Sequence, residues 1–324
     1  MATRRHSVIY THGGGRLGNQ IVRFAHWMAW VEEHAGQVEV VNPSFWPYSE
    51  LFATWREQPA CVYPLRAHTL DRVAGWEQGL APKWRQRFHW RFQRVLHAVG
   101  RVSPGWQAVA LNDPTGESVD LQSAEFLARV TSRRVTTCAG WKYSSWDLLG
   151  RHQDKLRPLF RPAPEYAQRS TDFIGDLRRR HDLVIGVLAR QSDYREWHDG
   201  DFFFPTTQYA QWIRQVLDLH PGRNVAFVVA SEEKQDATLF AGLPVHQATG
   251  NPGVGGHWFE NWAELALCDL VISAPSTFSA TAAFHGAVPL WPVVAGDQRM
   301  ALDQIIPEGM AGAARHPVFS ESVK

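Results

Sequence analysis

Leu183-Val184-Ile185-Gly186-Val187-Leu188-Ala189-Arg190-Gln191-Ser192-Asp193-Tyr194 is the stretch that decides the fold. Its apolar start predicts a buried strand, and Pro205 downstream is a natural first residue for a helix. Arg190 and Asp193 therefore follow the carboxyl end of a strand, the edge at which open α/β sheets bind ligands. An arginine there can bind a diphosphate through two hydrogen bonds and stays charged. The alternative is a structural Arg190–Asp193 pair that closes a turn.

The rest of the second half alternates between helix and strand patterns. Helices are expected at about 165–181, 206–219, 259–267 and 278–285, and strands at 183–188, 224–230, 270–273 and 289–294. Repeated strand–helix units of this length predict a parallel sheet with helices on both faces.

The first half begins with a similar unit. Its patterns predict a strand at 7–10, a glycine-rich turn at 13–20, a helix at 21–34 and further strands at 38–41, 108–111 and 135–138. Prolines at 158, 162 and 164 mark a linker. We therefore predict an α/β protein with two Rossmann-like domains, residues 1–160 and 161–324, and a cleft between them.

The glycine-rich turn matches the dinucleotide fingerprint only formally. The run from Gly13 to Gly18 has the G-x-G-x-x-G spacing, but the second strand ends in Asn42 rather than in an acid. We interpret the turn as a backbone loop that offers Arg16 and Asn19 to an anionic or polyhydroxyl ligand near a helix N-terminus. The alternative is a structural tight turn.

A further candidate site is the run Ser273-Ala274-Pro275-Ser276-Thr277-Phe278-Ser279, which follows a strand and begins a helix. Ser276 or Thr277 would cap that helix. A capped N-terminus, with its free N–H groups and positive dipole end, favours phosphate. Capping alone is the alternative, but the run lies at the same sheet edge as Arg190.

Acidic residues also gather at this edge. Ser231, Glu232 and Glu233 end the 224–230 strand. There the carboxylates either accept hydrogen bonds from ribose hydroxyls or a base, or lie solvated at a helix start.

The loop after Arg190 carries the densest group of titratable residues in the chain. Its acids are Glu196, Asp199 and Asp201. One of them is our candidate for a general base, with Asp201 and Asp199 ahead of Glu196. A solvated acidic loop is the alternative.

The composition narrows the class of protein. The chain has 324 residues, of which 44% are hydrophobic and 20% charged, as in globular proteins. The formal net charge of +1 predicts no nucleic-acid partner. Three widely spaced cysteines predict neither a disulfide framework nor a metal site, and no long apolar segment predicts a signal peptide or a membrane span. We therefore expect a cytoplasmic location.

The segment Lys83–Arg101 carries six basic residues and no acid. As a helix, it would place an apolar row on one face, which consists of Trp84, Phe88, Phe92, Val95 and Val99. A basic amphipathic helix suits an anionic membrane surface or an acidic partner. The alternative is a surface helix packed on the core.

Four motifs occur in the order found in the fucosyltransferase superfamily. Residues 15–20 resemble the N-terminal motif of α-1,2-fucosyltransferases, and residues 190–194 resemble their central His-x-Arg-Arg-Gly-Asp-Tyr motif. Residues 228–233 resemble the strand that ends in Ser-Asp-Asp, and residues 267–279 resemble the last motif. Similar motifs occur in α-1,6- and protein O-fucosyltransferases.

This resemblance implies a GT-B fold, a GDP-fucose donor held by the C-terminal domain, no cofactor, and metal-independent inversion at the sugar carbon. Arg190 matches the arginine that neutralises the departing diphosphate, Asp193 braces its loop, and Ser276 with Thr277 holds the β-phosphate. The expected donor-binding residues are Arg16, Gly18, Asn19, Arg190, Asp193, Ser231, Glu232, Glu260, Asn261, Ser276, Thr277 and Phe278. The acceptor would be a glycan or a glycolipid on the side of the N-terminal domain.

The chain departs from the family pattern at several positions. The motif histidine is Leu188, the second arginine is Gln191, and a tryptophan pair is Ala280-Thr281. The acid that reads the purine falls at Asn261, with Glu260 beside it. Two alternatives therefore stay open: another nucleotide sugar as donor, and a non-catalytic protein that binds a nucleotide or a glycan.

Overall fold

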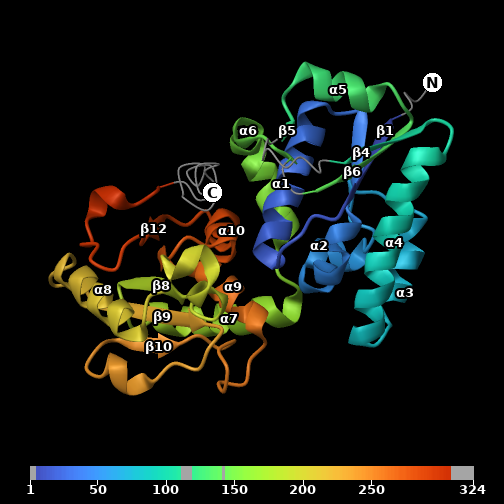
Figure 1. The fold of residues 1–324 in the computed structure, drawn as a ribbon. Coiled ribbons are helices and arrows are strands. Elements are labelled where there is room, and N and C mark those ends of the chain that lie inside the picture. Colours follow the sequence, from blue (N-terminus) through green and yellow to red (C-terminus); the bar gives the residue numbers. More distant parts are fainter. Residues whose placement is uncertain (1–4, 111–118, 141–142, 308–324) are drawn as a thin grey trace. The chain divides into compact units, whose positions relative to one another are not determined.

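The computed structural model describes residues 5–110, 119–140 and 143–307. The chain divides into two compact units, Met1–Arg161 and Pro162–Lys324, and each contains a five-stranded sheet (Figure 1). Within the described residues, no helix combines the length and the apolar character needed to span a bilayer.

The sheet of the first unit has the order β3-β2-β1-β6-β4. Its strands are β1 (His6–Thr11), β2 (Val38–Val41), β3 (Val62–Tyr63), β4 (Trp106–Ala110) and β6 (Val135–Ala139). The two-residue β3 is antiparallel to β2, whereas the other neighbours are parallel. A separate pair is formed by β5 (Val119–Asp120) and β7 (Tyr143–Ser144).

Helices cover both faces of this sheet. They are α1 (Leu17–Glu33), α2 (Ala53–Glu57), α3 (Leu70–Gln78), α4 (Pro82–Val102), α5 (Ala124–Thr131) and α6 (Trp146–Leu156). On one face, Trp27 of α1 packs against Tyr10 of β1, with ring centroids 5.5 Å apart. On the other face, Leu96 of α4 packs on a cluster that includes Ile9 and Val41.

Helix α1 begins at Leu17 and not at residue 21 as the pattern predicted. Arg16 takes the extended N-cap position directly before the helix. Gly15, the residue before Arg16, adopts a left-handed φ of 83° and so ends the loop. Gly18 and Asn19 therefore belong to the first helical turn and not to a preceding turn. Burial of Leu17 and Ile21, one turn apart, accounts for the earlier start.

Helix α4 packs on the sheet through only part of the expected apolar row. Trp84 and Val95 are 61% and 58% exposed, whereas Gln93 and His97 are buried. Polar contacts explain this orientation, because the Gln93 Oε1 accepts from the His12 N–H at 2.6 Å and from the Ser44 hydroxyl at 3.0 Å. Phe88 and Phe92 are only half-buried. The expected apolar row is therefore divided between exposed and half-buried positions.

The sheet of the second unit is parallel, as predicted, and its strand order is β10-β9-β8-β11-β12. Its strands are β8 (Leu183–Ala189), β9 (Val225–Ser231), β10 (Val245–Gln247), β11 (Leu270–Ser273) and β12 (Leu290–Pro292). Its helices are α7 (Pro164–Arg178), α8 (Thr206–Asp218), α9 (Trp258–Leu267) and α10 (Thr277–Gly286).

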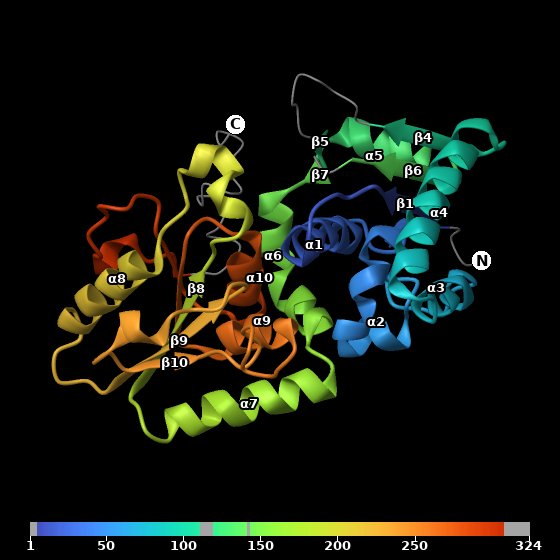
Figure 2. The same ribbon diagram turned by 60° about the horizontal axis from the view of Figure 1, so that its bottom comes forward.

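Side chains that alternate along β8 bind helices on opposite faces. Ile185 and Val187 lie in one core with Trp212 of α8. Gly186 faces the other way, toward Leu265 of α9. Helix α7 packs on α9, and α7 and α8 lie on opposite sides of the sheet (Figure 2).

The central strand β8 lies between β9 and β11, so the strand order reverses there. Ala189 is in register with Ser231, and Leu188 is in register with Ser273. The three strands therefore end at one edge, and their following loops meet at the switch point where such sheets bind ligands.

Candidate functional site

Arg190 is fixed at the end of β8 by two carboxylates. Its Nη2 donates to both carboxylate oxygens of Asp193, at 2.8 and 2.9 Å. Its Nε lies 3.5 Å from the Glu232 Oε1, and the side chain is only 15% exposed. The predicted pair with Asp193 therefore exists, and it holds the guanidinium in one place at the sheet edge.

Glu232 braces the loop that carries Arg190. Its Oε1 accepts hydrogen bonds from the Gln191 N–H at 3.0 Å, the Ser192 N–H at 3.1 Å and the Ser192 hydroxyl at 3.0 Å. These bonds tie the end of β9 to the loop after β8. The two readings from sequence, ribose contact and solvation, did not include this structural role.

Tyr194 connects Arg190 to the start of α10. Its ring centroid lies 5.3 Å from the Arg190 guanidinium carbon, and its hydroxyl donates to the Pro275 carbonyl oxygen. Burial raises the pKa of Tyr194 to about 12, so the hydroxyl keeps its proton at neutral pH. One buried ring thus holds the arginine and the helix N-terminus beside each other.

Helix α10 begins with a capped turn. The Ser276 hydroxyl accepts from the Phe278 N–H at 3.3 Å, and the Ser273 and Ser279 hydroxyls are 2.6 Å apart. Thr277 and Phe278 are half-buried at the first turn. The cap orders a turn whose remaining N–H groups and dipole favour an anion.

Ser231 is buried and hydrogen-bonded within the protein. Its hydroxyl donates to the Ala189 carbonyl oxygen at 3.0 Å and accepts from the Gln235 side chain at 3.0 Å. Gln235 also donates to the Gln191 Oε1 at 2.9 Å, and Gln191 donates to the Phe204 carbonyl oxygen at 3.0 Å. The residue at the position of the family's second arginine is thus a buried anchor for the returning loop.

Glu260 and Asn261 point to different surroundings. Glu260 lies 3.2 Å from the Arg169 guanidinium of α7 and accepts from the Thr249 hydroxyl at 2.7 Å. Asn261 lies at the sheet edge, where its Nδ2 donates to the Ser231 carbonyl oxygen at 3.3 Å. Its buried Oδ1 has no hydrogen-bond partner within the described residues. The oxygen packs against Gly250, where a Cβ would lie 2.6 Å from it. The contribution of Glu260 and Asn261 to donor binding stays a prediction.

The three candidate bases lie in the loop between β8 and α8. Glu196, Asp199 and Asp201 are all exposed. The backbone of residues 198–200 takes three successive left-handed φ values of 49°, 55° and 84°. Such a run is costly for non-glycine residues and marks a loop held by its surroundings. Their role as a general base stays a prediction.

Arg16, Gly18 and Asn19 lie in the first unit, at the start of α1. Arg16 is exposed, and the Asn19 side chain packs against Gly15 so closely that a Cβ there would lie 2.1 Å from its Nδ2. Their contribution to donor binding stays a prediction.

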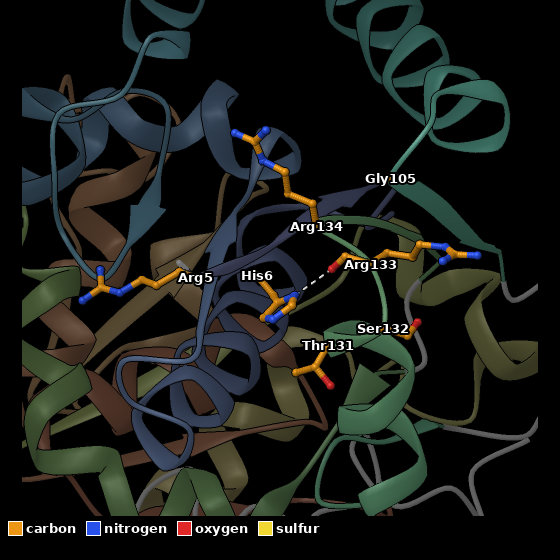
Figure 3. A pocket seen from close by; sticks show the side chains of 7 residues that line it. All are labelled: Arg5, His6, Gly105, Thr131, Ser132, Arg133 and Arg134. Atoms are coloured by element: carbon orange, nitrogen blue, oxygen red, sulfur yellow. Dashed lines mark hydrogen bonds between the residues drawn. The ribbon is translucent and has the colours of Figure 1, made fainter. Parts of the chain in front are cut away.

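A pocket of about 310 Å³ lies at the amino end of β1 in the first unit. Figure 3 shows that the side chains of Arg5, Arg133 and Arg134 point away from one another. His6 Nδ1 lies 2.7 Å from the Arg133 carbonyl oxygen. The arginines therefore do not converge on one anion. No group of three or more His, Cys, Asp or Glu side chains within the described residues could hold a metal ion.

No protein-family model and no curated protein matches the sequence. The solved structures that share its fold include two with a TM-score above 0.5. A mutant of Arabidopsis thaliana FUT1 in complex with GDP has a TM-score of 0.51 at 14% identity, over 92% of this chain and 73% of that chain. POFUT1 in complex with GDP has a TM-score of 0.51 at 11% identity, over 88% of this chain and 95% of that chain. The chain therefore has the GT-B fold of these fucosyltransferases, as its motifs predicted.

Proposed function

We propose that this chain is an inverting, metal-independent glycosyltransferase that transfers fucose from GDP-fucose to a hydroxyl of a glycan or glycolipid. The observation that carries the proposal is Arg190, held by two carboxylates at the switch point of a parallel sheet and joined through Tyr194 to α10. The solved structures of the same fold contain GDP, which supports the choice of nucleotide.

The chemistry follows from where charge develops. As the sugar–phosphate bond breaks, positive charge builds on the sugar carbon and negative charge on the leaving diphosphate. Arg190 and the first turn of α10, with Ser276 and Thr277, would stabilise that negative charge in advance, which water cannot do. A carboxylate of the 196–201 loop would take the proton of the acceptor hydroxyl, with Asp201 and Asp199 ahead of Glu196. Neither the stabilisation of the leaving diphosphate nor the proton transfer needs a metal ion.

Another nucleotide sugar is the second candidate. Asn261 has an unpartnered buried Oδ1 where the family pattern has an acid. A neutral amide offers one acceptor oxygen, whereas a carboxylate offers two, one for each of the adjacent N–H groups of guanine. This difference favours testing other bases beside guanine.

The first experiment is a thermal-shift comparison of GDP, UDP, ADP, CMP and their sugar nucleotides, with and without EDTA. A ligand that binds only the folded state raises the melting temperature. Stabilisation by GDP and GDP-fucose that EDTA does not change supports the proposal. Stabilisation by another nucleotide would change the identity of the donor and leave the proposed mechanism as it is. If none of these ligands changes the melting temperature, the donor site is rejected.

The second experiment compares Arg190→Ala with Arg195→Ala in the release of GDP from GDP-fucose. Arg195 lies in the same loop, is half-exposed and pairs with Glu233 at 2.7 Å, so it is a matched control. Loss of Arg190 should lower turnover by about 100-fold or more, and the control should not. Intact turnover in Arg190→Ala would contradict the mechanism. A wild-type protein that binds GDP and GDP-fucose without turnover, also with glycan acceptors present, would be a binding protein.

A further inference from the structure

The outer face of α4 combines exposed cations with exposed apolar side chains. The helix contains no aspartate or glutamate. Trp84, Trp90 and Val102 are 61%, 57% and 81% exposed. We call the exposed side chains of this helix the α4 outer face, and they are Lys83, Trp84, Gln86, Arg87, Trp90, Arg91, Arg94, Val95, Ala98, Arg101 and Val102.

These residues form an ordered surface. At 100° per residue, Arg87, Arg91 and Arg94 form a central stripe, with Trp90 on one side and Trp84 on the other. The Arg87 guanidinium carbon lies 5.6 Å from the Trp84 ring centroid, and that of Arg94 lies 4.9 Å from the Trp90 ring centroid. Each tryptophan is thus held beside a cation of the stripe. The helix has 21 residues and is about 31 Å long.

Helix α3 extends the same surface. It packs beside α4, as both ribbon views show (Figure 1, Figure 2). Its Trp76 is 58% exposed, and its ring lies 4.8 Å from that of Phe88. Three large indoles are therefore exposed in one region of the first unit.

The inner contacts of α4 do not require this outer composition. Gln93 and its partners His12 and Ser44 hold the helix on the sheet. Exposed indoles and valines contribute little to folding, because they remain in water. An exposed surface that combines indoles and valines with a stripe of cations is typical of an interaction site.

We propose that the α4 outer face docks flat on an anionic lipid bilayer. The arginine stripe complements anionic headgroups, and tryptophan side chains prefer the headgroup level, where the ring is apolar and its N–H can bind water. A nucleic acid would also attract the arginines, but a phosphate backbone offers nothing to Val95 and Val102. This proposal goes beyond the glycosyltransferase activity and does not depend on it.

The test measures flotation of the full chain with vesicles of phosphatidylcholine alone or in equal mixture with phosphatidylglycerol. The wild type should bind only the anionic vesicles. Arg87→Glu combined with Arg91→Glu should weaken binding by at least about tenfold. Arg133→Glu combined with Arg134→Glu changes the same charge at exposed residues of the same unit, and it should bind like the wild type.

A second pair of variants tests the indoles. Trp84→Ala combined with Trp90→Ala should reduce the binding that persists at high salt, whereas Trp258→Ala, an exposed indole of the second unit, should not. Melting curves close to that of the wild type would show that these exposed substitutions leave the fold intact. The proposal would be overturned if the wild type did not bind anionic vesicles, or if it bound duplex RNA instead of vesicles. It would also be overturned if the Arg133 and Arg134 control lost as much vesicle binding as the Arg87 and Arg91 variant. If the variant without the two tryptophans kept its vesicle binding at high salt, the idea that these side chains enter the headgroup level would be contradicted.

Discussion

At the scale of single residues, the candidate site is a set of charges that the protein itself holds in place. Arg190 binds Asp193, and Glu232 binds the backbone of the same loop. Carboxylates that accept such bonds are engaged before any ligand arrives. The arginine thus starts in the position in which it can stabilise a developing charge, and little reorganisation is needed during reaction.

Glu264 gives the folded chain a distinct pH dependence. It is fully buried on α9 and accepts from the Thr249 N–H at 3.1 Å. Burial raises its pKa from 4.5 to about 7. Between these values the folded state holds a proton that the unfolded state has released, so the free energy of unfolding falls as pH rises, by up to about 3 kcal/mol.

Glu264→Gln removes this titration. Its stability relative to the wild type should therefore improve from pH 5 to pH 8, as measured by urea unfolding at each pH. Glu196→Gln is an exposed control and should show no such trend. A relative stability of Glu264→Gln that is equal at both pH values would contradict the buried titration.

At the scale of elements, the contact between β8 and α9 depends on a glycine. A Cβ at Gly186 would lie 2.6 Å from Leu265 Cδ2 and 3.2 Å from the Cys268 sulfur. Gly186→Ala should therefore push α9 from the sheet and cost about 1–3 kcal/mol in urea unfolding. Gly175→Ala in the interior of α7 meets no close atom except the end of the Arg179 side chain at 3.9 Å, and should stabilise by about 0.5–1 kcal/mol. If Gly186→Ala changed the free energy of unfolding no differently from Gly175→Ala, α9 would have to shift at no cost, which would contradict the close packing.

Element patterns explain how far the sequence could predict this fold. The alternation in the second unit predicted its sheet, because each buried strand is bounded by a helix of clear period. The orientation of α4 could not be predicted, since it depends on Gln93 meeting His12, 81 residues earlier in the chain. The two-residue β3 is too short to leave a pattern.

The candidate site likewise contains residues that the sequence could predict and contacts that it could not. Motif order predicted Arg190 and Ser276 at one edge, because parallel strands end together. The Tyr194 contact with Pro275 spans 81 residues, and the Gln191 contact with Gln235 spans 44. Such contacts leave no local signal. The only indication was that Gln191 replaces an arginine of the family pattern.

At the scale of the whole molecule, each sheet has its own point of strand-order reversal. In the second unit this point carries the candidate donor site. Hydrogen exchange of the full chain, with and without saturating GDP, should therefore show new protection at residues 188–195, 231–235 and 273–280. Amides in β4 and α5 of the first unit, remote in the chain from any proposed donor contact, provide the internal control. Protection confined to the first unit would place the nucleotide there and contradict the proposed donor site in the second unit.

The distribution of indoles has a consequence for spectroscopy. Among the tryptophans that the structure describes, seven are fully buried, whereas the exposed ones are Trp76, Trp84, Trp90 and Trp258. A collisional quencher such as iodide reaches only emitters in contact with water. Three of these four exposed emitters lie on α3 and α4, so covering that surface should remove the larger part of their quenching. The unlabelled protein can thus serve as its own optical sensor of whatever covers it.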